Sequence, residues 1–268
     1  MSSFSSTSRP SDSADGLARS SHTWLGPVLF VLIVTATAVM VGLGIWQLAR
    51  LRDRRATNGE IRARMAQAPL ILTGQTGDLP EYQPVQISGT YDFAQEIVLR
   101  NRAFDQEPGV HLLTPLRIAG SGQAVLVDRG WIPYTQADPA GRIPVDGPPG
   151  LVTVLGIART SQVRTFFILP ADPTVSPAAP RLDTWFWVNV PQIQTQMPYR
   201  LLPFFVEAAP RADRSTLPVS GYDIDLSDGP HLSYAIQWFS FAIILLAGSF
   251  VLWRHRRHRA RSSAAPIA

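Results

Sequence analysis

One histidine stands where an ionisable side chain is costly. His231 opens an uncharged stretch that ends at Trp253, and Tyr234 and Trp238 follow it at spacings of three and four residues. A helix with this spacing places the three side chains on one face. Ionisable residues within membrane-spanning segments are rare and usually functional. His231 is therefore the first candidate for chemistry.

A second uncharged stretch runs from Leu25 to Trp46, and Arg50 follows one helical turn later. Ala38, Gly42, Trp46 and Arg50 recur every four residues and make one stripe on a helix. The two helix ends would supply an imidazole for iron, aromatic faces for a macrocycle and a guanidinium for propionates, a set that suits a haem. The alternative is an interfacial histidine beside an ordinary aromatic belt. The candidate binding residues are His231, Tyr234, Trp238, Trp46 and Arg50, with His231 as the metal ligand.

Other chemistry finds little support among the remaining residues. His111 and Asp128 could act as a base and its orienting group, but nothing marks a nucleophile beside them. His255 and His258 have a ligand spacing, yet they stand among arginines that would repel a cation. The chain has no Cys, which excludes disulfides, a covalent c-type haem and a thiolate copper site. We therefore expect no catalytic residues and no enzyme.

Both uncharged stretches are long enough to cross a membrane. The first would extend about 33 Å as a helix, compared with a hydrocarbon core of about 30 Å. It exceeds the apolar run of about 7 to 15 residues that is usual in a cleaved signal peptide, which is the competing interpretation. We predict transmembrane helices over residues 24–49 and 231–253, with the lipid bilayer as a partner.

Arginines flank both helices, so charge alone barely decides the orientation. The basic residues after the first stretch are Arg50, Arg52, Arg54 and Arg55, and those after the second are Arg254, Arg256, Arg257, Arg259 and Arg261. The rule counts best over short segments, so the dense C-terminal cluster weighs more. This predicts cytoplasmic termini, an external domain and no nucleic-acid binding. All 24 basic residues are Arg, which indicates a high-GC bacterial source.

Between the helices the pattern is typical of short strands. We expect a disordered tail over residues 1–23, a juxtamembrane helix over 50–68, a β-rich domain over 69–230 and a basic tail over 254–268. Period-two alternation predicts strands at Val85–Tyr91, Ile97–Leu99, Val110–Ile118, Ala124–Asp128, Leu151–Arg159, Trp185–Val190 and Phe204–Ala208, with one short helix near Pro191–Met197. Pro-bearing segments at 138–150 and 170–181 should be surface loops. The predicted fold is α+β, a mostly antiparallel barrel or sandwich between two membrane helices.

Four motifs occur in order along the chain: GIWQLAR at Gly44–Arg50, VQISGTY at Val85–Tyr91 followed by Asn101 and Arg102, GVHLLTPL at Gly109–Leu116 with VDRGWIP at Val127–Pro133, and HLSYAIQWF at His231–Phe239. With these motifs the sequence resembles the Surfeit locus family of cytochrome c oxidase assembly factors, in its bacterial and more narrowly its actinobacterial type. Two of the motifs stand at the membrane ends, and the resemblance covers Trp24 to Trp253. The chain departs from the family where Asp53 and Arg54 replace an expected lysine, and in its long Pro-rich segments.

The resemblance implies a domain outside the bacterial plasma membrane and a role in maturing the haem-copper oxidase. The implied task is to help haem a reach subunit I, with His231 matching the family's histidine and haem a synthase as a further partner. A structural scaffold that binds the synthase and the oxidase without holding haem is the alternative. We also expect Gly130 and Trp131 to form a turn at the barrel end, and Arg102 and Arg129 to meet acidic groups on Asp92, Asp128 or a partner.

Overall fold

The computed structural model describes residues 24–137, 150–163, 171–173, 175–176, 180–213, 215–222 and 224–262. The chain divides into two compact units. The first comprises Met1–Ala56 and Ser227–Ala268, and the second comprises Thr57–Leu226. The predictions for the tail at 1–23 and for most of the loop at 138–150 lie outside the described residues.

Two long helices form the first unit. Helix α1 spans Leu25–Met65 and helix α3 spans His231–Ser262. Both are long and apolar enough to be candidate membrane spans. Pro27 lies in the first turn of α1, where proline is tolerated, and the next proline is Pro69, so the helix continues through the charged residues after its apolar part. Helix α3 likewise continues through the C-terminal arginines, and Arg257 stacks over the Trp253 ring with its guanidinium carbon 3.9 Å from the ring centroid.

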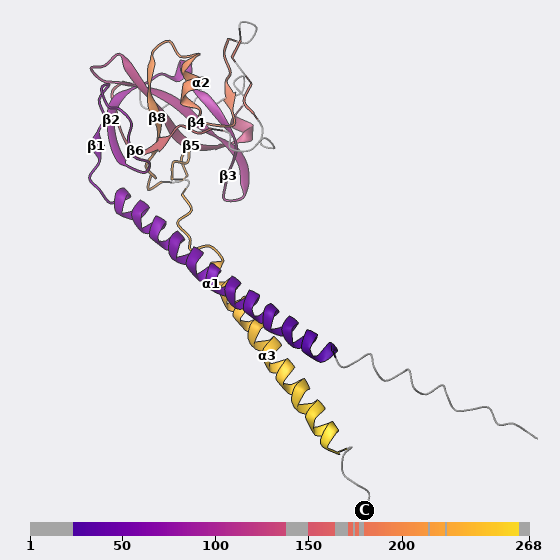
Figure 1. Cartoon of the computed structure of the whole chain (residues 1–268). Helices are drawn as coiled ribbons and strands as arrows, with labels where there is room; N and C mark the ends of the chain where they lie inside the picture. The colour runs from indigo at the N-terminus through magenta and orange to yellow at the C-terminus, as the bar shows by residue number, and fades with distance from the viewer. Residues whose placement is uncertain are drawn as a thin grey trace, which may run out of the picture. The chain divides into compact units, whose positions relative to one another are not determined.

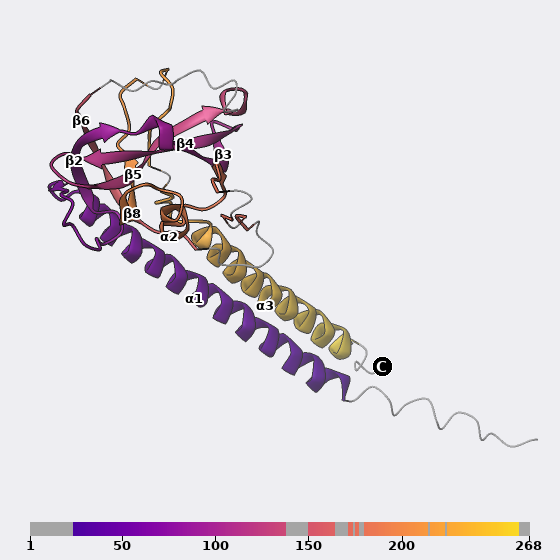
Figure 2. The same ribbon diagram turned by 90° about the horizontal axis from the view of Figure 1, so that it is seen from above.

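Within this unit α1 and α3 pack side by side and run antiparallel (Figures 1 and 2). Gly44 allows their close approach, because a Cβ there would lie 2.7 Å from the Phe239 ring. Ala235 and Ala242 are buried on the facing side of α3. Small residues at such positions let two helix backbones come together. The outward faces are rich in exposed large apolar side chains, which is typical of helices that face lipid.

The second unit is a β-barrel with a flanking layer. Its strands are β1 (Leu70–Ile71), β2 (Pro84–Tyr91), β3 (Ile97–Phe104), β4 (Glu107–Ile118), β5 (Gln123–Pro133), β6 (Val152–Thr160), β7 (Thr184–Trp185) and β8 (Arg200–Ala208), and its helix is α2 (Val190–Gln194). The sheet order is β1-β2-β6-β8-β5-β4-β3-β7. An additional pairing of β2 with β4 closes the ring β2-β6-β8-β5-β4 (Figure 1). The β1–β2, β3–β7 and β5–β8 pairs are parallel, and the others are antiparallel.

Strand β5 separates two apolar clusters. Val125 and Val127 belong to the cluster that also contains side chains of β2 and β6, whereas Ala124 and Leu126 belong to the cluster under α2. Successive strand residues point to opposite faces, so β5 is buried on both sides. Trp185 lies fully buried in the second cluster. This double burial makes β5 the most constrained strand of the barrel.

The predicted α+β class, with two apolar helices flanking a barrel-containing domain, is confirmed, and so are six of the seven strands and the short helix. The strand expected at Trp185–Val190 was wrong beyond Trp185. The backbone N–H groups of Phe186 and Trp187 donate to the carboxylate of Asp172 instead of to a neighbouring strand. Asn189 then caps α2 by accepting from the N–H of Gln192 at 3.2 Å.

Candidate functional site

His231 is the first residue of α3, and Gln47 of α1 holds its ring. The Nδ1 atom of His231 lies 2.9 Å from Oε1 of Gln47. An amide oxygen only accepts, so Nδ1 is the donor in this hydrogen bond, and in a neutral imidazole Nε2 would then carry the lone pair. The neighbouring segment supports this geometry, because Asp228 forms a 2.8 Å ion pair with Arg55 of α1. The start of α3 is therefore fixed against α1 at two points.

The other predicted binding residues flank this pair without meeting His231. Trp46 is 53% exposed and Tyr234 is 47% exposed, while Arg50 is also exposed. Trp238 is half-buried and packs edge to face on Phe241, with ring centroids 6.1 Å apart. Within the described part of the chain, no hydrogen bond or ring contact joins His231 to Trp46 or Arg50. The aromatic rings border the histidine, and the amide orients it.

Gln47 was not among the binding residues predicted from the sequence, because it lies outside the stripe of residues four apart that ends at Arg50. Gln47 follows Gly44 by three residues, and both lie on the α1 face that contacts α3. A hydrogen-bonding side chain at that spacing, inside an apolar helix end, was the available signal. The GIWQLAR motif thus contributes its glutamine to contact with His231, while its tryptophan and arginine stay exposed.

A second polar cluster lies in the barrel domain beside His111. Its Nδ1 atom lies 2.8 Å from Oδ2 of Asp128, and Oδ1 of Asp128 accepts from the N–H of Gly130 at 3.0 Å. This pairing confirms the suggested arrangement of a histidine and its orienting carboxylate. The register of the β3–β4 pair shifts between Leu99 and Arg102 of β3. The register of the β4–β5 pair shifts between Leu112 and Leu113 of β4. Such bulges often re-aim side chains at functional sites.

Arg129 meets a partner that sequence reasoning did not identify. Its Nη1 atom lies 3.0 Å from Oε2 of Glu96, and both side chains are buried. Thr114 donates to the same oxygen at 2.5 Å. The guanidinium also lies over the Tyr91 ring, 5.2 Å from its centroid. The expected partners Asp92 and Asp128 have other contacts, since Asp92 accepts from the Tyr199 hydroxyl and Asp128 from Gly130 and His111.

The turn expected at Gly130 and Trp131 is wrong, because both residues lie within strand β5 and pair with Leu112 and His111 of β4. Gly130 has a φ of +120°, which only glycine adopts readily, and a Cβ there would collide with the carbonyl oxygen of Val219. Trp131 and Val219 exchange two backbone hydrogen bonds of 3.0 and 2.8 Å. The glycine therefore lets a late segment of the chain pack against β5.

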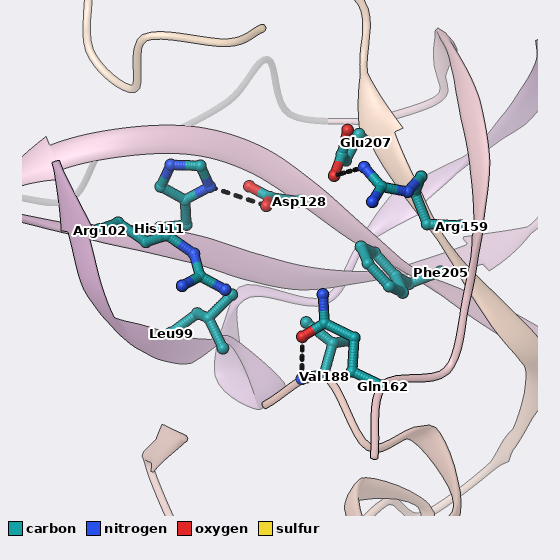
Figure 3. A pocket seen from close by; sticks show the side chains of 9 residues that line it. All are labelled: Leu99, Arg102, His111, Asp128, Arg159, Gln162, Val188, Phe205 and Glu207. Atoms are coloured by element: carbon teal, nitrogen blue, oxygen red, sulfur yellow. Dashed lines mark hydrogen bonds and ion pairs between the residues drawn. The ribbon is translucent and has the colours of Figure 1, made fainter. Parts of the chain in front are cut away.

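A small polar chamber of about 40 Å³ adjoins the His111 pair (Figure 3). Arg159 lies on one side, where its Nη1 atom is 2.5 Å from Oε1 of Glu207. Burial disfavours the charged guanidinium, but the Glu207 carboxylate outweighs this effect and raises the pKa of Arg159. Among the described residues, no group of three or more His, Asp or Glu side chains could hold a metal ion. The polar contacts among the residues that line the chamber are hydrogen bonds and ion pairs.

The chain has two apolar helices on either side of a closed β-barrel in the sequence, and a histidine of one helix is hydrogen-bonded to the other. It therefore belongs to the class of β-barrel proteins with candidate membrane anchors. The chain belongs to the SURF1 family, whose model matches residues 34–243. A SURF1-like protein of Monosiga brevicollis is 29% identical over 258 residues, which cover 90% of this chain and 94% of that protein.

Vertebrate and bacterial relatives match as well. Surfeit locus protein 1 of Mus musculus is 25% identical over 240 residues, covering 84% of this chain and 73% of the relative. A SURF1-like protein of Rickettsia conorii is 25% identical over 233 residues, covering 85% and 91%. The family resemblance drawn from the four motifs is confirmed, while the actinobacterial type stays a prediction.

Proposed function

We propose that the protein is a non-enzymatic assembly factor for a haem-copper cytochrome c oxidase, assisting the delivery or insertion of haem a into subunit I. The observation that carries the proposal is the hydrogen bond of 2.9 Å between His231 and Gln47. Metal-binding histidines commonly donate their second ring N–H to an oxygen, which fixes the tautomer and the ring orientation. Membership of the SURF1 family supplies the biological context that the resemblance implies.

The residues around His231 fit a haem as cargo. Gly229 leaves room beside the ligating nitrogen, because a Cβ there would lie 3.6 Å from Nε2 of His231. The exposed rings of Trp46 and Tyr234 offer flat apolar faces, and Arg50 offers a cation for a propionate. Haem a would supply an iron that accepts an axial imidazole. In this proposal Nε2 of His231 binds the iron, and Gln47 holds the imidazole in the correct tautomer.

The proposal also includes location and partners. The two candidate spans would anchor the chain in the bacterial plasma membrane, with both termini in the cytoplasm and the barrel outside. Subunit I and haem a synthase would be its protein partners. Because the chain has no Cys, a single cysteine placed at the exposed Ala119 would report the side of the membrane. An impermeant maleimide added to whole cells should label it, and labelling only after lysis would contradict the orientation.

Haem binding is tested on the full chain purified from cells that make haem a. The visible spectrum and the haem content per protein are measured for the wild type, His231→Ala and Gln47→Leu. We expect His231→Ala to lose the bound haem and Gln47→Leu to bind it about 10 to 100 times more weakly, as is usual when an outer hydrogen bond to a metal-bound histidine is removed. His255→Ala, on an exposed position of the same helix, is the matched control.

Each outcome distinguishes haem carriage from scaffolding. An unchanged haem content in His231→Ala would refute the role of this histidine. A wild type that carries no haem, yet captures subunit I and haem a synthase from the same membranes, would support the scaffold instead. Resonance Raman spectra of the wild type and of Gln47→Leu should differ in the iron–imidazole stretch, because the glutamine polarises the ring. An identical stretch would exclude a positioning role for Gln47.

A further inference from the structure

A groove of about 450 Å³ opens on the barrel beside the His111 pair. Its walls come from β3, β4, the end of β5, Pro210 and residues 219–222. Phe104, Trp131 and Tyr222 give it an aromatic lining, with the first two rings 5.6 Å apart between centroids. Its volume lies within the range of about 300 to 1,000 Å³ that is usual for small-molecule sites. Apolar walls of this kind suit a flat or apolar ligand body.

Arg102 stands where the groove meets the inner chamber, since it lines both cavities together with His111. The guanidinium of Arg102 has a backbone partner only, because its Nη1 atom donates to the carbonyl of Asn101 at 3.3 Å. By contrast, the buried Arg129 and the largely buried Arg159 each contact a carboxylate. Within the described residues, Arg102 is thus a half-buried cation without an acidic partner.

The chamber side of Arg102 is rich in hydrogen-bond donors. Gln162 exchanges two hydrogen bonds with Val188, as its backbone N–H donates to the Val188 carbonyl at 2.8 Å and its Oε1 accepts from the Val188 N–H at 3.1 Å. The amide orientation is therefore fixed, and the NH₂ group points into the chamber (Figure 3). Two donors that converge beside an open groove favour an acceptor with negative charge.

The acidic groups of the chamber each have a partner of their own. Asp128 accepts from His111 and Gly130, and Glu207 pairs with Arg159. None of the described residues that line the outer groove is acidic, so the positive charge of Arg102 faces no carboxylate in that lining. Burial, and then the nearby Glu207, raise the pKa of Tyr222, so its hydroxyl remains a hydrogen-bond donor at neutral pH.

We propose that this groove binds an anionic small molecule with an aromatic or other flat apolar body, whose oxyanion pairs with Arg102 at the mouth of the chamber. The body packs between Phe104, Trp131 and Tyr222. The head is a carboxylate or a phosphate monoester, since both match the planar guanidinium. This site lies wholly within the barrel domain and is independent of the proposed haem ligand His231.

The test is calorimetric titration of the full chain in nanodiscs with benzoate, phenyl phosphate and the neutral benzamide. We expect an anion to bind and benzamide not to bind, and the first two probes distinguish a carboxylate from a phosphate site. Arg102→Gln should weaken anion binding about 10- to 100-fold, the usual effect of losing one charged hydrogen bond. Arg117→Gln removes the same charge from an exposed position on β4 and should leave binding unchanged.

A second variant removes the ligand contact with little change of shape. Gln162→Glu keeps the oxygen that accepts from Val188 but replaces the donor NH₂ by a charged oxygen, which supplies Arg102 with an internal carboxylate. It should abolish anion binding while the thermal midpoint stays near that of the wild type. Equal binding of benzoate and benzamide, no binding of either anion to the wild type, or anion binding that survives both Arg102→Gln and Gln162→Glu would overturn the proposal.

Discussion

The buried ion pair between Arg129 and Glu96 allows a quantitative test of the barrel. Both side chains are less than 10% exposed, at 8% and 7%, and the pair has an N···O distance of 3.0 Å. Glu96→Gln preserves shape but removes the carboxylate charge that faces Arg129, whose guanidinium also lies over the Tyr91 and Phe93 rings. Loss of one partner of a buried pair typically costs about 3 to 5 kcal/mol. Because the glutamine oxygen can still accept, we expect the lower value, about 3 kcal/mol.

The assay is thermal unfolding of the full chain in detergent, followed by near-ultraviolet circular dichroism of the aromatic side chains. For a domain of this size, about 1 kcal/mol shifts the midpoint by about 2 to 4 °C, so Glu96→Gln should lower it by roughly 6 to 12 °C. Asp183→Asn is the control, since its ion pair with Arg181 is 2.7 Å long but has side chains 31% and 48% exposed. Exposed pairs contribute about 0 to 1 kcal/mol.

The double variant Glu96→Leu with Arg129→Met removes both charges of the buried pair. Replacing both charges by apolar groups of similar volume is often neutral or stabilising, so the double variant should recover most of the lost midpoint. Equal shifts for Glu96→Gln and Asp183→Asn would refute the idea that an uncompensated buried charge sets the cost. A double variant as unstable as Glu96→Gln would show that packing, and not charge, governs this position.

Three further predictions concern the backbone, the helix pair and pH. Gly130→Ala should destabilise the barrel by about 3 kcal/mol, because the backbone φ is positive and the new methyl group would collide with its neighbours. Gly122 has open space around it, so Gly122→Ala should be nearly neutral. Equal thermal midpoints for the two variants would contradict this prediction. Gly44→Leu should move helices α1 and α3 apart, whereas Gly42→Leu should not. The distance between spin labels on introduced cysteines measures this separation. An unchanged distance in Gly44→Leu would exclude the observed packing. Burial raises the pKa of Tyr199, and so does the carboxylate that accepts a hydrogen bond from its hydroxyl group. The folded state therefore holds the phenolic proton more tightly than the unfolded chain. Stability should therefore fall as pH rises above the unfolded value of about 10, and Tyr199→Phe should flatten the decline in an unfolding titration; an unchanged slope would reject the assignment.

The local elements were predictable from the sequence, but their closure was not. Alternation of apolar residues identifies β2, because one of its faces is buried, whereas β5 is recognised by a continuous apolar run because both of its faces are buried. The ring closes through only three residue pairs between β2 and β4, and nothing in the local pattern of either strand specifies that partner. The failure at Trp185–Val190 has a similar origin, because a distant aspartate replaces the neighbouring strand as acceptor.

The same limit applies to the sites. His231 stood out because an ionisable residue at a membrane helix end is unusual, yet its partner Gln47 is 184 residues away in the chain. Arg129 finds Glu96 across 33 residues, and sequence spacing could not rank that carboxylate above Asp92 or Asp128. Residue type identified candidate groups, whereas their pairing depended on bulges and on helix packing that only the folded chain supplies.

The position of β8 has a consequence for synthesis of the protein. This strand, Arg200–Ala208, lies between β5 and β6, so the ring stays open until its last residues have been made. Until then β5 and β6 present unpaired, strongly apolar edges, which are prone to join other chains. If α1 is already in the bilayer, it restricts such encounters to neighbours in the same membrane. A nascent chain cut short before Ala208 is therefore expected to be cleared by proteolysis, while a chain that reaches α3 contains every strand of the ring before its second candidate span is made.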